Sequence, residues 1–183
     1  LEIECFCRIL PLENSRKNDG MQKPSILVAP LDWGLGHAAR CIPLVNELII
    51  QGWEVSLAGS GHSLSILQKE FPRLPGFSLK GYDIFYHSAT GNLGFTIARQ
   101  IPKIWAAIRH EHRWLQQALT THRFNAVLSD NRYGLHAENV HSVFMTHQLA
   151  IRSGMHARID QLLQWLNYRY IHQFNECWIP DLE

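Results

Sequence analysis

A histidine that follows two glycines is the residue of this chain best suited to chemistry. His37 lies in "ILVAPLDWGLGHAARCIPL", where Gly34 and Gly36 precede it and a helical pattern begins at Ala38. A helix N-terminus disfavours a protonated imidazole, and a neutral imidazole can accept a proton near neutral pH. Glycines lack side chains, so a substrate can approach the backbone closely. The pattern therefore fits His37 as a general base, and it equally fits a side chain that packs or caps at the helix start.

Three further polar side chains are expected near His37 because of where the strands end. Asp130 directly follows one apolar run that reads as a strand, and His147 and Gln148 follow the next. Ligands of parallel sheets bind at the carboxyl ends of the strands, so these residues should share one edge. A carboxylate at Asp130 could fix the imidazole tautomer and stabilise its charged form after proton transfer. On spacing alone, Asp130 could instead bond backbone amides, and His147 and Gln148 could simply end a strand.

The same glycines also fit a dinucleotide-binding fingerprint, G-x-G-x-x-A, from Gly34 to Ala39. In that fold the first glycine directly follows the strand, and an acidic residue at the end of the next strand binds the ribose. Here residues 30–33 separate the strand from Gly34, and residues 58–60 read Ala-Gly-Ser without an acid. The sequence therefore disfavours an NAD(P)-dependent oxidoreductase.

Composition and charge argue against several classes of protein. The 183 residues are 46% hydrophobic with a net charge of +1, so nucleic-acid binding has no electrostatic support. No apolar run is long enough to cross a membrane. The four cysteines (Cys5, Cys7, Cys41 and Cys177) match neither a disulfide framework nor a zinc ribbon. We therefore expect a protein of the reducing cytoplasm without a bound metal.

The alternation of strands and helices predicts the architecture that positions these residues. It indicates an α/β, Rossmann-like three-layer domain whose parallel sheet is covered on both faces. The expected strands are 25–29, 54–58, 77–79, 84–86, 126–129, 142–146 and 177–179. The expected helices are 38–51, 63–71, 101–121 and 157–174.

The two ends of the chain carry expectations of their own. Residues 1–20 finish in the polar stretch "ENSRKNDG", which is typical of a linker, so we expect them to be an extension outside the fold. The Rossmann-like domain is then expected over residues 21–181. Its last strand is followed by Pro180 and Asp181, a pattern typical of a linker to a further domain.

Four motifs taken together resemble one family. They are "ILVAPLDWGLGHAARCIPLVNEL", "AVLSDNRYGL", "VFMTHQL" and "CWIPD". Together they resemble the N-terminal half of GT-B glycosyltransferases, and most nearly the bacterial peptidoglycan N-acetylglucosaminyltransferase family, whose first loop has a Gly-rich segment ending in Gly-His. The resemblance covers about residues 25–181, and Asp32 and Trp33 make the first loop longer than in that family.

The resemblance implies two Rossmann-like domains that face a cleft. The N-terminal domain binds the acceptor, the C-terminal one binds most of the nucleotide-sugar donor, and catalysis needs no metal or other cofactor. This chain would be the acceptor half, with the donor-binding domain absent and no sugar transfer on its own. By the resemblance, His37 activates the acceptor hydroxyl and Asp130 is its partner. The residues expected to bind substrate are Trp33, Gly34, Gly36, Arg40, Arg132, Tyr133, His147 and Gln148.

Other functions stay open beside sugar transfer. They are a nucleotide-sugar epimerase of the same fold, a non-catalytic module that binds sugar or lipid, and the less favoured oxidoreductase. Acceptors of related enzymes are often lipid-linked, and Arg152, Arg158 and Arg169 beside Trp165 and Leu166 would suit contact with a bilayer surface. A helix that faces the core is the favoured alternative. We therefore expect a cytoplasmic protein, with peripheral contact at the inner face of the membrane left open.

Overall fold

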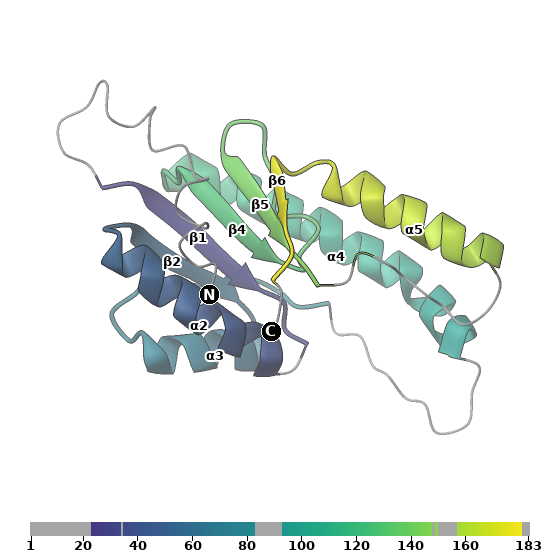
Figure 1. The fold of residues 1–183 in the computed structure, drawn as a ribbon, viewed down its shortest axis with the longest axis horizontal. Coiled ribbons are helices and arrows are strands. Elements are labelled where there is room, and N and C mark those ends of the chain that lie inside the picture. The colour runs from purple at the N-terminus through teal and green to yellow at the C-terminus, as the bar shows by residue number, and fades with distance from the viewer. Residues whose placement is uncertain (1–22, 34, 83–92, 148, 150–156, 181–183) are drawn as a thin grey trace.

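A six-stranded parallel sheet forms the centre of the structure (Figure 1). The computed structural model describes residues 23–33, 35–82, 93–147, 149 and 157–180. The strand order is β3-β2-β1-β4-β5-β6, and every pairing is parallel. The strands are β1 (Ser25–Pro30), β2 (Glu54–Gly59), β3 (Gly76–Ser78), β4 (Ala126–Asp130), β5 (His141–Met145) and β6 (Glu176–Trp178).

Helices cover both faces of this sheet. Helices α2 and α3 lie on one face, and α4 and α5 lie on the other, as Figure 1 shows. Their bounds are α2 (Leu35–Ile50), α3 (Gly61–Glu70), α4 (Leu93–Thr121) and α5 (Ala157–Ile171). The prediction of a Rossmann-like α/β domain is therefore confirmed, while the expected strand 84–86 and the extension 1–20 lie outside the described residues.

The central strand β1 is apolar on both faces because helices cover both of them. On one face Ile26 and Val28 pack in a cluster with Cys41 of α2. On the other face Leu27 packs in a cluster with Leu115 of α4. All of these side chains are at most 1% exposed, so β1 is held in a close-packed core, and the loop that follows it starts from a fixed position.

None of the helices in the described part of the chain has the length and apolar character needed to cross a bilayer. The longest of them, α4, faces the sheet with one apolar stripe and exposes polar residues elsewhere. This stripe holds Ile108 and Leu115, both buried, at the spacing that the sequence predicts.

Gly134, just after β4, has no room for a side chain. A Cβ atom there would lie 2.3 Å from the carbonyl oxygen of Ile108 and 2.6 Å from Cβ of Glu111, both on α4. Backbone atoms can yield only if the helix moves. We therefore expect Gly134→Ala to lower the free energy of unfolding by about 2 kcal/mol or more, measured by urea unfolding. The matched control is Gly36→Ala, because a Cβ atom there meets nothing within 4 Å. Equal unfolding midpoints for both variants would contradict the expectation.

His136 makes the stability of the fold depend on pH. Burial, and then the charge of His112, lower the pKa of His136 from 6.5 to about 4. The two rings lie 4.7 Å apart between centroids. Because the folded pKa lies below the unfolded one, the stabilisation is complete above about pH 6.5 and is lost as the pH falls towards 4.

The expected loss is roughly 1–2 kcal/mol of unfolding free energy between pH 7 and pH 4, after discounting for the partly exposed ring. Urea unfolding at several pH values measures it, with His136→Phe as the comparison. The aromatic replacement keeps the contact with Phe174 and removes the titrating group. Parallel pH profiles for the two proteins would contradict the assignment to His136.

Candidate functional site

His37 and Asp130 form a hydrogen-bonded pair at the carboxyl edge of the sheet. Pro30, the last residue of β1, stands opposite Asp130 of β4 in the register, and α2 begins after a short loop. His37 lies in the first turn of α2, and its Nδ1 is 2.8 Å from Oδ2 of Asp130. The Asp130 side chain is 1% exposed and that of His37 is 11% exposed. The parallel sheet thus brings together two residues that the sequence predicts to be a pair.

This contact assigns the imidazole proton of His37. A carboxylate accepts hydrogen bonds only, so Nδ1 of His37 donates and Nε2 keeps its lone pair. Among the residues that the structure describes, nothing bonds to this Nε2 atom. An acceptor nitrogen held in this way can take a proton from a hydroxyl that reaches it.

Arg40 lies one turn after His37 on α2 and contacts three side chains of the site. Its Nη1 is 2.9 Å from Nδ1 of His147, and its Nε is 3.6 Å from Oδ2 of Asp130. Its Nη2 is also 3.2 Å from Nδ1 of His37. Nδ1 cannot donate to the carboxylate and accept from Arg40 at once, and the shorter contact with the buried carboxylate decides the assignment.

Of the remaining predicted residues, Trp33 and Gly36 are exposed, whereas Arg132 and Tyr133 make structural contacts within the fold. Trp33 is 37% exposed, with its ring edge-on to Tyr82. Gly36 is exposed, with open space where a Cβ would stand, so the surface above it is unobstructed. Gly34 and Gln148 lie outside the described residues.

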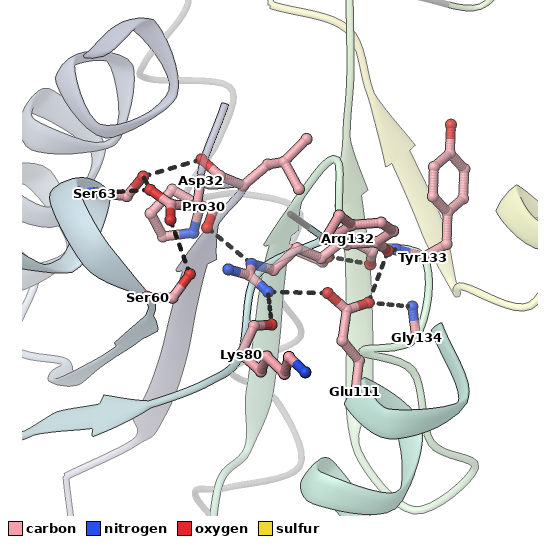
Figure 2. A network of polar contacts seen from close by, with 12 residues as sticks. Pro30, Asp32, Ser60, Ser63, Lys80, Glu111, Arg132, Tyr133 and Gly134 are labelled. Carbon is pink, nitrogen blue, oxygen red and sulfur yellow. Dashed lines mark hydrogen bonds and ion pairs between the residues drawn. The ribbon is translucent and has the colours of Figure 1, made fainter. Parts of the chain in front are cut away.

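Arg132 is not on the surface of the site, which corrects the sequence-based expectation. Its side chain is 0% exposed, and its Nη1 lies 2.9 Å from Oε1 of Glu111 on α4. Its Nε donates to the carbonyl oxygen of Pro30 at 2.8 Å, and Nη1 reaches the carbonyl oxygen of Lys80 at 3.3 Å (Figure 2). Arg132 therefore ties the end of β1 to the segment that follows β3.

Tyr133 likewise makes structural contacts within the fold. Its hydroxyl donates to Oδ1 of Asn167 on α5 at 2.8 Å, and its ring packs against Phe144. Burial raises the pKa of Tyr133 to about 12, so the hydroxyl stays protonated at neutral pH. These contacts connect the loop after β4 to α5. The hydroxyl that was expected to bind substrate is already hydrogen-bonded to Asn167.

Two structural residues near the site escaped the sequence analysis. Glu111 is 0% exposed; it accepts from the hydroxyl of Tyr82 at 2.8 Å and from the amide of Gly134 at 3.1 Å. Burial raises the pKa of Glu111 despite the neighbouring Arg132 guanidinium. The signal in the sequence is its position between Ile108 and Leu115, since a glutamate in an apolar helical stripe must find a buried partner.

Asp32 is the second of these residues, and it joins the loops after β1 and β2. Its carboxylate accepts from the hydroxyls of Ser60 and Ser63, each at 2.9 Å, and from the amide of Ser63 at 3.3 Å (Figure 2). Ser63 lies in the first turn of α3, so a negative charge here offsets the unpaired amides of the helix N-terminus. Asp32 thereby fixes the loop that carries Trp33 and leads into α2, the helix of His37.

No family model and no curated protein sequence matches the chain. Among solved structures, the chain is similar to MurG from Acinetobacter baumannii, with a TM-score of 0.49 and 15% identity over 88% of this chain and 44% of that one. It is also similar to a UDP-glucosyltransferase from Polygonum tinctorium capable of glucosylating indoxyl, with a TM-score of 0.42 and 15% identity over 69% and 30% of the two chains. The chain thus spans less than half the length of either of these proteins.

Proposed function

We propose that this chain is the acceptor-binding half of a GT-B glycosyltransferase, which moves a sugar from a nucleotide-sugar donor to an acceptor hydroxyl. The observation that carries the proposal is the His37–Asp130 pair. The Asp130 carboxylate is buried, and its Oδ2 lies 2.8 Å from Nδ1 of His37. The lone pair on Nε2 of His37 points away from this contact. A base of this kind at the carboxyl edge of a parallel sheet suits the activation of a hydroxyl.

The proposed step is a single displacement at the anomeric carbon of the donor. Nε2 of His37 takes the acceptor proton while the acceptor oxygen forms its bond to that carbon. The bond from the anomeric carbon to the phosphate oxygen breaks, and the nucleoside diphosphate leaves with the electron pair. Asp130 keeps the imidazole oriented and stabilises the imidazolium that forms. Gly36 leaves the approach open, since no atom lies within 4 Å of the place of its missing Cβ.

The proposal extends to the rest of the site and to the domains. Trp33, Gly34, His147 and Gln148 would contact the acceptor, which is a sugar or a lipid-linked molecule. Residues 21–181 would form the acceptor domain, residues 1–20 would be an extension, and a second domain would hold most of the donor. This half would not transfer sugar alone, because the donor phosphates would have no partner in it.

The test uses the full-length protein that contains this chain. It is incubated with a panel of nucleotide sugars and with glycoside or lipid-linked acceptors, and the release of nucleoside diphosphate is measured. We expect release that depends on both a donor and an acceptor. Conversion of the donor's sugar without any acceptor would instead identify an epimerase. Thermal stabilisation of this chain by NAD(P) would favour an oxidoreductase, and sugar binding without turnover would favour a binding module.

A peripheral membrane contact is the second part of this proposal, and the exposed face of α5 supports it. Leu162 and Trp165 are each 56% exposed and Tyr168 is 45% exposed, while the guanidinium of Arg169 lies 5.7 Å from the Trp165 ring. Apolar and aromatic side chains beside cations suit the cytoplasmic face of a bilayer that carries a lipid-linked acceptor.

Co-sedimentation with vesicles that contain anionic lipid tests this contact. Leu162→Gln combined with Trp165→Gln should reduce the bound fraction several-fold, because apolar burial supplies much of the affinity. Ile50→Gln is the matched control, since Ile50 is 77% exposed on α2, on the opposite face of the sheet. Equal binding by the double variant and the control would refute the contact.

A further inference from the structure

The orientation of the His147 ring is set by Arg40. Nη1 of Arg40 lies 2.9 Å from Nδ1 of His147, which follows β5 and is exposed. A guanidinium donates hydrogen bonds and accepts none, so Nδ1 of His147 must be the acceptor. The ring proton of a neutral His147 therefore lies on Nε2, the nitrogen that faces away from Arg40.

The two histidines of the site thus have opposite polarity. His37 carries its proton on Nδ1 and presents an acceptor at Nε2, while His147 presents a donor at Nε2. Their ring centroids are 6.4 Å apart, and the ring planes are inclined by 39°. Arg40 stands between them, which leaves them close enough for neighbouring oxygen atoms of one small molecule to reach both.

Arg40 itself is committed to protein contacts. Its Nη1 is bonded to His147, its Nη2 is 3.2 Å from His37, and its Nε is 3.6 Å from Asp130. Its side chain is 23% exposed. A guanidinium whose three nitrogens already face site residues is better placed to orient them than to bind an incoming molecule.

We propose that Arg40 is a positioning residue that holds His147 as a hydrogen-bond donor beside the His37 base. The acceptor substrate is then a polyhydroxylated molecule. One of its hydroxyls gives its proton to His37, and a neighbouring oxygen accepts from Nε2 of His147. The substrate class rests on the proposed function, whereas the tautomers of the two rings do not.

The tautomers are tested directly on the 183-residue chain with isotope-labelled histidine. Long-range proton–nitrogen NMR correlations, assigned with His37→Gln and His147→Gln, should show His37 protonated at Nδ1 and His147 at Nε2. In Arg40→Met the His147 signals should move to a mixture of tautomers, and Arg40→Lys should restore part of the Nε2-protonated form. His37 should keep its pattern in both variants, because Asp130 holds it. Protonation of His147 at Nδ1 in the unchanged chain would overturn the assignment.

The substrate class is tested on the full-length protein with two acceptors, one of which lacks the hydroxyl next to the glycosylated one. His147→Ala should raise KM for the intact acceptor about tenfold, the equivalent of one hydrogen bond, with kcat within a few-fold. KM for the deoxy acceptor should not change. An equal rise for both acceptors would overturn the substrate class. Predicted tautomers without any sugar transfer by the unchanged protein would support the role of Arg40 and overturn the proposed function.

Discussion

Replacing His37 with alanine in the full-length protein should lower kcat for the proposed sugar transfer by a factor of about 10² to 10⁴, the usual contribution of a general base. KM for the acceptor should change much less, because the imidazole takes a proton only as the new bond forms. Initial rates of nucleoside diphosphate release measure both constants. The reason is geometric: Nδ1 is bonded to a buried carboxylate at 2.8 Å, so Nε2 is the basic atom.

Two comparisons make this result specific. Asp130→Asn should lower kcat by a similar factor, since an amide can hold the ring in the wrong tautomer, and the double variant should be little worse than either single one. His172→Ala is the control, because His172 is exposed between α5 and β6, and the starts of the parallel strands lie at the opposite edge of the sheet from His37. Activity of His37→Ala within a few-fold of the unchanged protein would refute the assignment of the base.

Breaking the buried ion pair should produce the largest loss of stability. Arg132→Met leaves the Glu111 carboxylate without its cation in a place that is 0% exposed, and it removes the donors to Pro30 and Lys80. Removing one partner of such a pair costs about 3–5 kcal/mol, so urea unfolding should show a loss of that size. Tryptophan fluorescence can follow the transition, since the chain holds six tryptophans.

The double variant Arg132→Met/Glu111→Gln separates charge from packing. It should be more stable than Arg132→Met alone, because no unpaired charge is left buried. The partly exposed pair of His141 and Glu176, 3.0 Å apart, is the matched control, and Glu176→Gln should cost less than about 1 kcal/mol. If Arg132→Met also cost less than about 1 kcal/mol, the framework role of Arg132 would be wrong.

Patterns local in sequence predicted the strands and the edge at which the site lies. The central strands β1 and β4 begin where their apolar runs begin, at Ser25 and Ala126, because buried parallel strands need continuous apolar residues. The position of Asp130 beside His37 followed from the rule that the carboxyl ends of parallel strands share one edge. The contact between His37 and Asp130 could therefore be predicted without knowing the structure of the residues between them.

The starts of α2 and α4 were predicted less well than the strands. Helix α2 begins at Leu35 and includes Gly36, because the first turn of a helix needs no partners for its amides and tolerates glycine there. The longest helix was expected from residue 101, where its apolar stripe begins. The helix instead begins at Leu93 and continues through Pro102.

The long-range partner of Arg132 could not be predicted. Arg132 lies two residues after Asp130, and placement at the same edge suggested the same surface. Between them Asn131 adopts a left-handed conformation with φ of 57°, which turns the chain sharply after β4. Arg132 is buried against Glu111, and the turn that takes it there depends on the backbone angle of one residue and on the place of α4.

The pairing of β1 with β4 has a consequence for the order in which the protein can fold during synthesis. His37 and Asp130 are 93 positions apart, and β2 and β3 both emerge from the ribosome before β4 does. Until β4 arrives, one side of β1 is an unpaired, apolar edge, the kind of strand that joins other chains. Contacts of such long sequence separation also form slowly. The His37–Asp130 pair is therefore assembled late, and a nascent chain that ends before Ala126 would lack this pair and be prone to aggregate.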